Sequence, residues 1–128
     1  MKNKIRTTLA PWLSVRDSQA AVEFYKAAFG AVETYHLEGE GGSVISRLSI
    51  EGVEFWVSEG GPAPEGDETL GGHTIRMILT VPDPEYYFSR ALQAGGREIF
   101  PVGVDHGWKL GRLVDPFGLH WEIGHPTE

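Results

Sequence analysis

The chain contains an internal repeat, and this repeat limits the possible folds more than any other feature of the sequence. Residues 13–17 match residues 79–83 in the pattern Leu-x-Val-x-Asp at an offset of 66, which also relates Gly30 to Gly96. Three matches follow at an offset of 65, namely Arg47 with Arg112, Leu48 with Leu113 and Trp56 with Trp121. We infer that the second half has lost one residue between its helix and its last strand. Neither half is large enough to bury a sheet face alone, so the two must pack together.

The first half predicts one strand, one helix and three further strands. Residues 8–15 are typical of a buried strand, and Asp17 or Ser18 can accept hydrogen bonds from the N–H groups of a helix that follows. Apolar residues recur at helical spacing up to Gly30, which is expected to end the helix. Strand-like runs come next, at residues 31–37, 43–50 and 53–58, with glycine-containing turns between them.

The second half repeats this order after a linker rich in glycine, proline and acidic residues at 60–72. A strand is expected at 73–81, and the sequence Asp83-Pro84-Glu85 favours a helix start. The helix should end at Gly95 or Gly96, and residues 115–118 suit a type I turn. Further strands are expected at 98–102, 108–114 and 119–123. The sequence thus predicts one α+β domain over residues 1–128, with βαβββ modules at about 5–59 and 73–125.

Composition narrows the classes of partner and chemistry. The chain has no cysteine, which excludes disulfides, thiolate nucleophiles and cysteine-bound zinc, and favours a cytoplasmic location. Its net charge of -7, without a basic stripe, argues against nucleic acid and permits a cationic ligand. No apolar run approaches the roughly 18 residues that a membrane span requires. We therefore expect neither a nucleic-acid partner nor a membrane partner.

Two further motifs carry a family resemblance. Residues 24–31 read Phe-Tyr-x-x-x-Phe-Gly-Ala, and residues 115–122 place an Asp-Pro-Phe-Gly turn before a strand that contains Trp121 and Glu122. Together with the repeated motif at 13–17, these resemble the vicinal-oxygen-chelate superfamily, which includes glyoxalase I, extradiol dioxygenases and bleomycin-resistance proteins, and most closely its PhnB-like branch. The resemblance implies tandem βαβββ modules that form a curled mixed sheet around one cavity, with helices outside, in a homodimer.

The resemblance also implies where a metal would bind. Metal-dependent members carry up to four ligands on the first and last strands of each half. The matching positions are Glu122, Val57 at the offset of 65, Arg76, and Ala10 at the offset of 66. Only Glu122 is an ordinary metal ligand, because alanine and valine offer no lone pair and arginine stays protonated. We therefore expect no metal and no cofactor, with His120 and Glu122 as the best remaining ligand pair.

Strand alternation predicts which side chains line the pocket instead. If Glu122 points inward, then His120 does too and, through the repeat, so do Phe55 and Val57. Leu13, Val15, Leu79, Val81, Trp56, Trp121 and Ile123 should pack under the helices. The complete set of predicted ligand-binding residues is Trp12, Phe55, Val57, Arg76, Ile78, Trp108, His120 and Glu122. We also expect Arg76 and Glu122 to form a buried salt bridge across the seam between the halves.

Three classes of function remain open after these arguments. The first is a protein that binds a small organic molecule, because an apolar pocket with a few polar groups is typical of such a site. The second is a metal-independent enzyme of the lyase or isomerase type, with Glu122 or His120 as the general base. The third is a structural or accessory dimer with a vestigial pocket.

Overall fold

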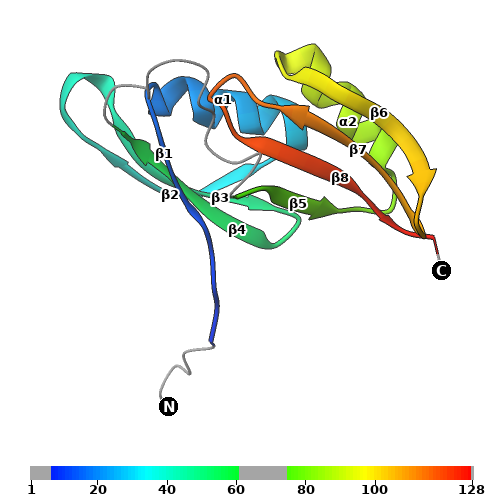
Figure 1. Ribbon diagram of the computed structural model, residues 1–128. Coiled ribbons are helices and arrows are strands. Elements are labelled where there is room, and N and C mark those ends of the chain that lie inside the picture. The colour runs from blue at the N-terminus through cyan, green and yellow to red at the C-terminus, as the bar shows by residue number, and fades with distance from the viewer. Residues whose placement is uncertain (1–6, 61–74, 128) are drawn as a thin grey trace.

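The computed structural model describes residues 7–60 and 75–127, and each range folds into a strand, a helix and three more strands (Figure 1). The first range contains β1 (Trp12–Val15), α1 (Ser18–Phe29), β2 (Val32–Glu38), a short 3-10 helix η1 (Glu40–Gly42), β3 (Val44–Ile50) and β4 (Val53–Glu59). The second contains β5 (Met77–Thr80), α2 (Pro84–Ala94), β6 (Arg97–Asp105), β7 (Trp108–Val114) and β8 (His120–Pro126). The predicted α+β class and βαβββ order are confirmed. All but the first residue of the predicted linker at 60–72 lies outside the described ranges.

Both helices begin and end where the sequence indicates. The Asp17 carboxylate accepts a hydrogen bond from the Ala20 N–H at 3.0 Å, and Asp83 accepts one from Tyr86 at 3.2 Å. Gly30 ends α1 in the left-handed conformation, with φ of 68°. Neither helix of the described ranges is long and apolar enough to cross a membrane.

Four strand boundaries differ from the prediction by three or four residues, at the starts of β1 and β5 and at the ends of β6 and β8. β1 begins at Trp12 instead of residue 8, directly after Pro11, which has no N–H group to donate to a sheet. β6 runs to Asp105 instead of residue 102. Its register with β7 shifts twice, between Glu98 and Phe100 and again before Gly103, so this outer strand continues past Pro101 by bulging.

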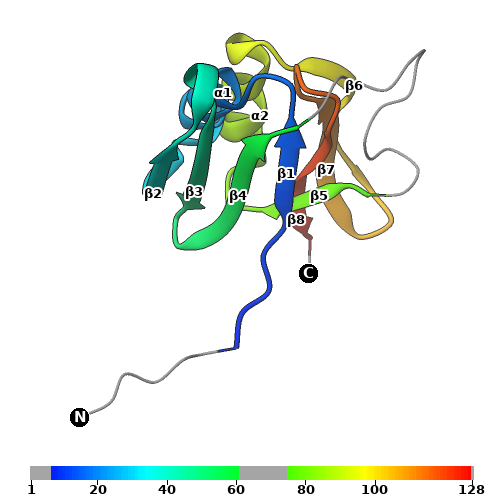
Figure 2. The same ribbon diagram turned by 90° about the vertical axis from the view of Figure 1, so that its left-hand side faces the viewer.

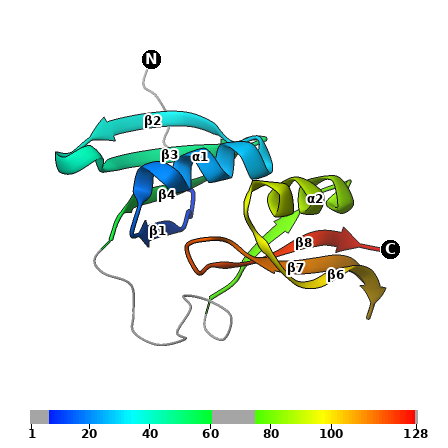
Figure 3. The ribbon, with the colours of Figure 1, turned by 90° about the horizontal axis from the view of Figure 1, so that it is seen from above.

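The strands form two four-stranded mixed sheets, ordered β1-β4-β3-β2 and β5-β8-β7-β6. In each sheet the first and last strands of that half pair in parallel, and the other pairs are antiparallel. Both helices lie on the same side of the sheets (Figures 1 and 2), and α1 packs beside α2. Seen from above, α1 covers the first sheet and α2 the second (Figure 3). Each sheet therefore has one face under a helix and one face turned away.

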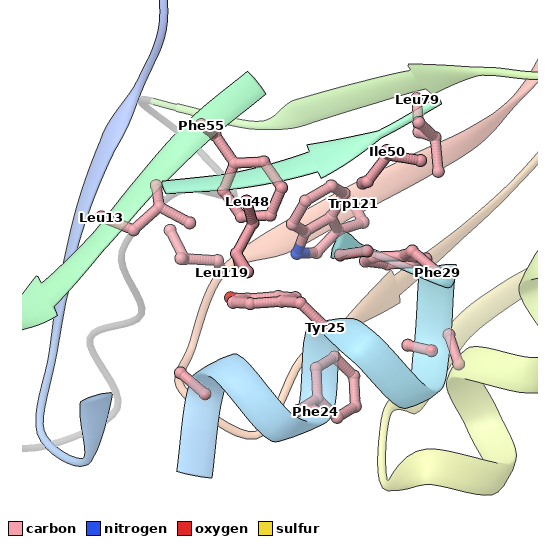
Figure 4. Close-up of a cluster of buried hydrophobic side chains, with 14 of the residues drawn as sticks. Leu13, Phe24, Tyr25, Phe29, Leu48, Ile50, Phe55, Leu79, Leu119 and Trp121 are labelled. Carbon is pink, nitrogen blue, oxygen red and sulfur yellow. The ribbon is translucent and has the colours of Figure 1, made fainter. Parts of the chain in front are cut away.

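One core under α1 joins the two halves. Trp121, from β8 of the second half, lies against Phe29 of α1 with ring centroids 4.6 Å apart (Figure 4). Tyr25 lies edge-on to Phe55 of β4, at 5.3 Å. Leu13, Val15, Leu79, Val81, Trp121 and Ile123 are all buried, as predicted. This shared core confirms that the halves bury their sheets together.

A buried carboxylate fastens the turn between β7 and β8 to α1. Asp115 Oδ2 accepts hydrogen bonds from the Tyr25 hydroxyl at 2.5 Å and from the Trp121 Nε1–H at 2.9 Å. Its Oδ1 accepts the backbone N–H groups of Phe117 and Leu119, which closes the predicted turn. Burial, together with the negative charge of Asp115, raises the pKa of the Tyr25 hydroxyl well above its usual value. Tyr25 therefore stays a proton donor to this carboxylate.

We expect Tyr25→Phe to lower the free energy of unfolding by about 1.5–3 kcal/mol, because it removes a donor from a buried charged acceptor. Tyr87→Phe is the matched control, since the Tyr87 hydroxyl donates to Glu51 at the same distance of 2.5 Å but at an exposed site. That change should cost less than about 1 kcal/mol. Urea denaturation of both variants measures the difference, and equal losses would show that burial of Asp115 adds nothing.

Candidate functional site

The sheet faces turned away from the helices, called the open face below, hold most of the predicted site residues. In the second half Arg76, Ile78, His120 and Glu122 are exposed or partly exposed, whereas their neighbours Leu79, Trp121 and Ile123 are buried. In the first half Trp12 and Ser14 lie on the open face, while Leu13 and Val15 are buried. The alternation predicted for β1, β5 and β8 is therefore confirmed.

The predicted orientation of β4 is wrong. Phe55 and Val57 are 3% and 0% exposed and belong to the core under α1, so they do not share a face with Glu122. Trp56, which was expected under the helix, instead lies on the open face, where its ring stacks on Trp12 at a centroid distance of 5.5 Å.

The reason is the length of one turn. Ser49 pairs with Glu54 across four residues, whereas the corresponding pair, Val114 and His120, spans five. The residue that the second half lost between its helix and Arg112 is thus regained before β8. Trp121 therefore corresponds to Phe55, and Glu122 corresponds to Trp56. A shift of one residue moves every side chain of a strand to the opposite face.

The corrected positions do not fit a metal ion. The set becomes Ala10, Trp56, Arg76 and Glu122, and an indole ring, like alanine, has no lone pair to give a metal. The Arg76 Nε lies 3.3 Å from a Glu122 carboxylate oxygen, so a permanent cation stands beside the one suitable ligand. Among residues 7–60 and 75–127, no group of three or more His, Cys, Asp or Glu side chains could hold a metal.

A row of aromatic and cationic side chains crosses the open face of the first sheet. Tyr35, Arg47, Trp56 and Trp12 are successive cross-strand partners in β2, β3, β4 and β1. The Arg47 guanidinium lies 5.4 Å from the centroid of the Trp56 ring. The Tyr35 ring, in β2, has its centroid 5.6 Å from that of Trp56. Sequence reasoning missed Tyr35 and Arg47 as surface features of this face. The repeated arginine, Arg47 with Arg112, was the available signal.

The equivalent row in the second sheet borders a hollow. Phe100, Arg112, Glu122 and Ile78 are cross-strand partners in β6, β7, β8 and β5. Beside them is a hollow of about 530 Å³, and its lining residues are Phe100, Pro101, Gly103, Val104, Asp105, His106, Trp108, Leu110 and Glu122. Two residues of the predicted set, Trp108 and Glu122, therefore line the same hollow.

His120 is held as a neutral donor. The Arg112 Nε–H donates a hydrogen bond to His120 Nδ1 at 3.2 Å, which places the ring proton of a neutral imidazole on Nε2. Burial lowers the pKa of His120 below its ordinary value, and the charges of Arg112, Arg97 and Arg76 lower this pKa further. A ring with its acceptor nitrogen occupied in this way is poorly arranged to be a general base.

The predicted ion pair between Arg76 and Glu122 is present, but its surroundings differ from the expectation. Both residues belong to the second half, so the pair does not bridge the seam between halves. The Arg76 side chain is 43% exposed and that of Glu122 is 17% exposed. Because water screens the charge of Arg76, the cost of losing one partner falls well below the several kcal/mol of a fully buried pair.

Comparison with known proteins identifies the family. Residues 5–123 match the model of the glyoxalase/bleomycin resistance protein/dioxygenase superfamily. The chain belongs to this superfamily. An uncharacterized protein of Mycobacterium bovis, Mb0911c, is 34% identical over 135 residues, which cover 99% of this chain and 88% of that protein.

Solved structures share the fold at lower identity. The crystal structure of TioX from Micromonospora sp. ML1 has a TM-score of 0.73 at 23% identity and covers 94% of this chain and 99% of TioX. The fosfomycin resistance protein FosX of Listeria monocytogenes has a TM-score of 0.72 at 17% identity, with 97% and 96% of the two chains covered. These likenesses confirm the fold of the chain.

A double-mutant cycle should detect the Arg76–Glu122 pair. We expect Arg76→Met to lower the free energy of unfolding more than Arg76→Met combined with Glu122→Leu, with a coupling of about 0.5–1 kcal/mol. The matched pair is Arg47 with Glu54, at 3.4 Å and with both side chains more than a third exposed, at 35% and 42%. Its coupling should be smaller. Additive losses at Arg76 and Glu122 in urea denaturation would contradict the pairing.

Proposed function

We propose that the chain is a PhnB-like member of its superfamily that binds a small organic molecule in the hollow on the open face of its second sheet. The observation that supports this proposal is the composition of that hollow. Its wall is apolar at Phe100, Trp108 and Leu110 and ends at the carboxylate of Glu122. A concave apolar surface with a few converging polar groups is the usual character of a small-molecule site.

The apolar wall of the hollow lies on paired strands, so it is already formed before a ligand binds. Phe100 and Leu110 belong to neighbouring strands that are hydrogen-bonded over most of their length, and Trp108 begins one of them. Side chains on paired strands lose little further freedom when a ligand arrives, which reduces the entropic cost of binding. The superfamily description includes bleomycin resistance, and a structural neighbour is a fosfomycin resistance protein, so both drugs belong in a first panel.

A metal-independent enzyme is the second candidate, and the position of Glu122 favours it. Its carboxylate is mostly buried at the edge of the hollow, where a bound molecule would meet it. His120 is the weaker candidate base because Arg112 occupies its Nδ1. Loss of turnover in Glu122→Gln, with binding retained, would distinguish catalysis from simple binding.

We further propose that the working form is a cytoplasmic homodimer that covers part of the open face. Trp12, Tyr35 and Ile78 all lie on that face, outside the hollow, and are between 44% and 57% exposed. Apolar surface gathered on one face favours association, because its removal from water is worth about 25 cal/mol per Å².

A thermal-shift panel tests the binding proposal. Bleomycin, fosfomycin, planar aromatic acids and amines, and divalent metals are each added to the purified protein. We expect at least one organic compound to stabilise it, by about 2.7 kcal/mol at a hundredfold excess over its dissociation constant. Trp108→Ala should weaken that shift, whereas Tyr86→Ala, at an exposed site on α2, should leave it unchanged. A response to metals alone would overturn the proposal.

Sedimentation equilibrium tests the dimer. At micromolar concentration we expect twice the mass of one chain, and Ile78→Lys should shift the equilibrium toward monomer by placing a charge on the covered face. Tyr86→Lys changes a residue of similar exposure on the helix side and serves as control; Ile78 and Tyr86 are 57% and 52% exposed. A wild-type monomer at these concentrations would contradict the assembly.

A further inference from the structure

A glycine in the middle of β6 borders the hollow of the second sheet. Gly103 lines this hollow and is the cross-strand partner of Leu110, which lines it too. Residues directly opposite each other on two paired strands share a face of the sheet, so a side chain at position 103 would point into the hollow. Among the described residues, the nearest atom to a Cβ placed there would be the Pro101 carbonyl oxygen, at 4.0 Å. A side chain at this position would therefore meet open space.

Neither the backbone nor the packing requires glycine at position 103. Gly107, in the turn after β6, has a φ of 81°, which favours glycine. Gly111 is confined by packing, since a Cβ atom there would lie 2.8 Å from the backbone nitrogen of Val102. Gly103 has a negative φ and no such neighbour, so the register shift before it does not depend on a left-handed residue. A glycine that weakens a strand without such a reason often marks a place where a ligand approaches.

The first half carries a side chain where the second half has none. Leu37 of β2 pairs with Ile45, and the repeat relates Ile45 to Leu110 at the offset of 65. Gly103 pairs with Leu110 and so takes the place of Leu37. Leu37 lines a hollow of about 320 Å³ on the first sheet, whereas the hollow beside Gly103 is about 530 Å³. The larger hollow is thus the one from which the leucine is missing.

We propose that Gly103 is a specificity-determining residue, because the space left by its missing side chain admits a bulky apolar group of the bound molecule, such as a second ring or a branched alkyl chain. The rest of the apolar part lies against Phe100, Trp108 and Leu110. Filling this space removes more of the ligand from water and so strengthens binding. This inference rests on the proposed function and names the size of the ligand's apolar part.

Two fluorescent probes that differ by one ring test the assignment. N-phenyl-1-naphthylamine carries a phenyl group that 1-naphthylamine lacks, and both are uncharged in neutral buffer. Fluorescence titration of the folded wild-type protein should give about tenfold tighter binding of the larger probe, because the phenyl ring removes additional apolar surface from water.

Substitution of Gly103 should abolish this preference. We expect Gly103→Leu to weaken binding of N-phenyl-1-naphthylamine about tenfold and to change binding of 1-naphthylamine less than about twofold, because the new side chain occupies the space of the phenyl group. Gly103→Ala fills less of that space and should have an intermediate effect. Ser89→Leu adds the same side chain at an exposed site on α2 and serves as control, with neither affinity changed.

Urea denaturation of the variants distinguishes a role in binding from a role in folding. Gly103→Ala should raise the midpoint, since alanine restricts the unfolded chain and meets no close neighbour in the folded one. Gly111→Ala is the matched variant and should lower the midpoint, because its Cβ would press against Val102. A similar loss of stability in Gly103→Ala would show that the fold needs this glycine, and would overturn the proposal.

The remaining outcomes separate this inference from the proposed function. Equal binding of the two probes by the wild-type protein, or undiminished binding of the larger probe by Gly103→Leu, overturns the role of Gly103 and leaves the apolar site standing. If a compound of the thermal-shift panel binds and neither probe does, the same variants are titrated with that compound, and the same criterion applies to Gly103→Leu. Failure of the probes and of the whole panel overturns the site itself, and the inference with it. Loss of the preference in Gly103→Leu at undiminished stability supports the role.

Discussion

The arrangement of the two halves depends on one buried carboxylate. Asp115 directly follows β7, and its Oδ2 accepts hydrogen bonds from the Tyr25 hydroxyl of α1 and the indole N–H of Trp121 in β8. A buried charge is stable only when donors surround it, so helix, turn and strand must meet in one geometry. Because the turn that Asp115 closes also sets the register of β8, the same contact fixes which side chains of that strand reach the open face.

Much of this fold follows from local signals. The helices begin at Asp17 and Asp83 because each carboxylate accepts an N–H group of the first turn, and such caps are legible in a single sequence. The faces of β1, β5 and β8 follow from simple alternation next to buried leucine and tryptophan. Alternation was enough to predict that Trp12, Arg76, Ile78, His120 and Glu122 lie on the face away from the helices, and the ion pair of Arg76 with Glu122 was also foreseen.

The remaining placements depend on how the strands pair. The alternation of residues within one strand carries no information about that pairing. Matching Trp56 with Trp121 by residue type gave a plausible offset and the wrong face for Phe55 and Val57, because the turn lengths of the two hairpins differ. The gathering of Arg76, Arg97 and Arg112 near His120 was also hidden, since these arginines are apart in the sequence and only the sheet brings them together.

The longer turn at Asp115 has a consequence for how the two halves could come to differ. In a duplicated chain, substitutions change one position at a time and usually cost stability at each step. One additional residue ahead of β8 instead exchanges the inner and outer contents of a whole strand at once. Trp56 stands on the surface as a stacking partner while Trp121 fills the core, so the two tryptophans match by residue type but occupy different faces. Length variation in a hairpin can thus turn a symmetric duplicate into a scaffold with two unlike surfaces.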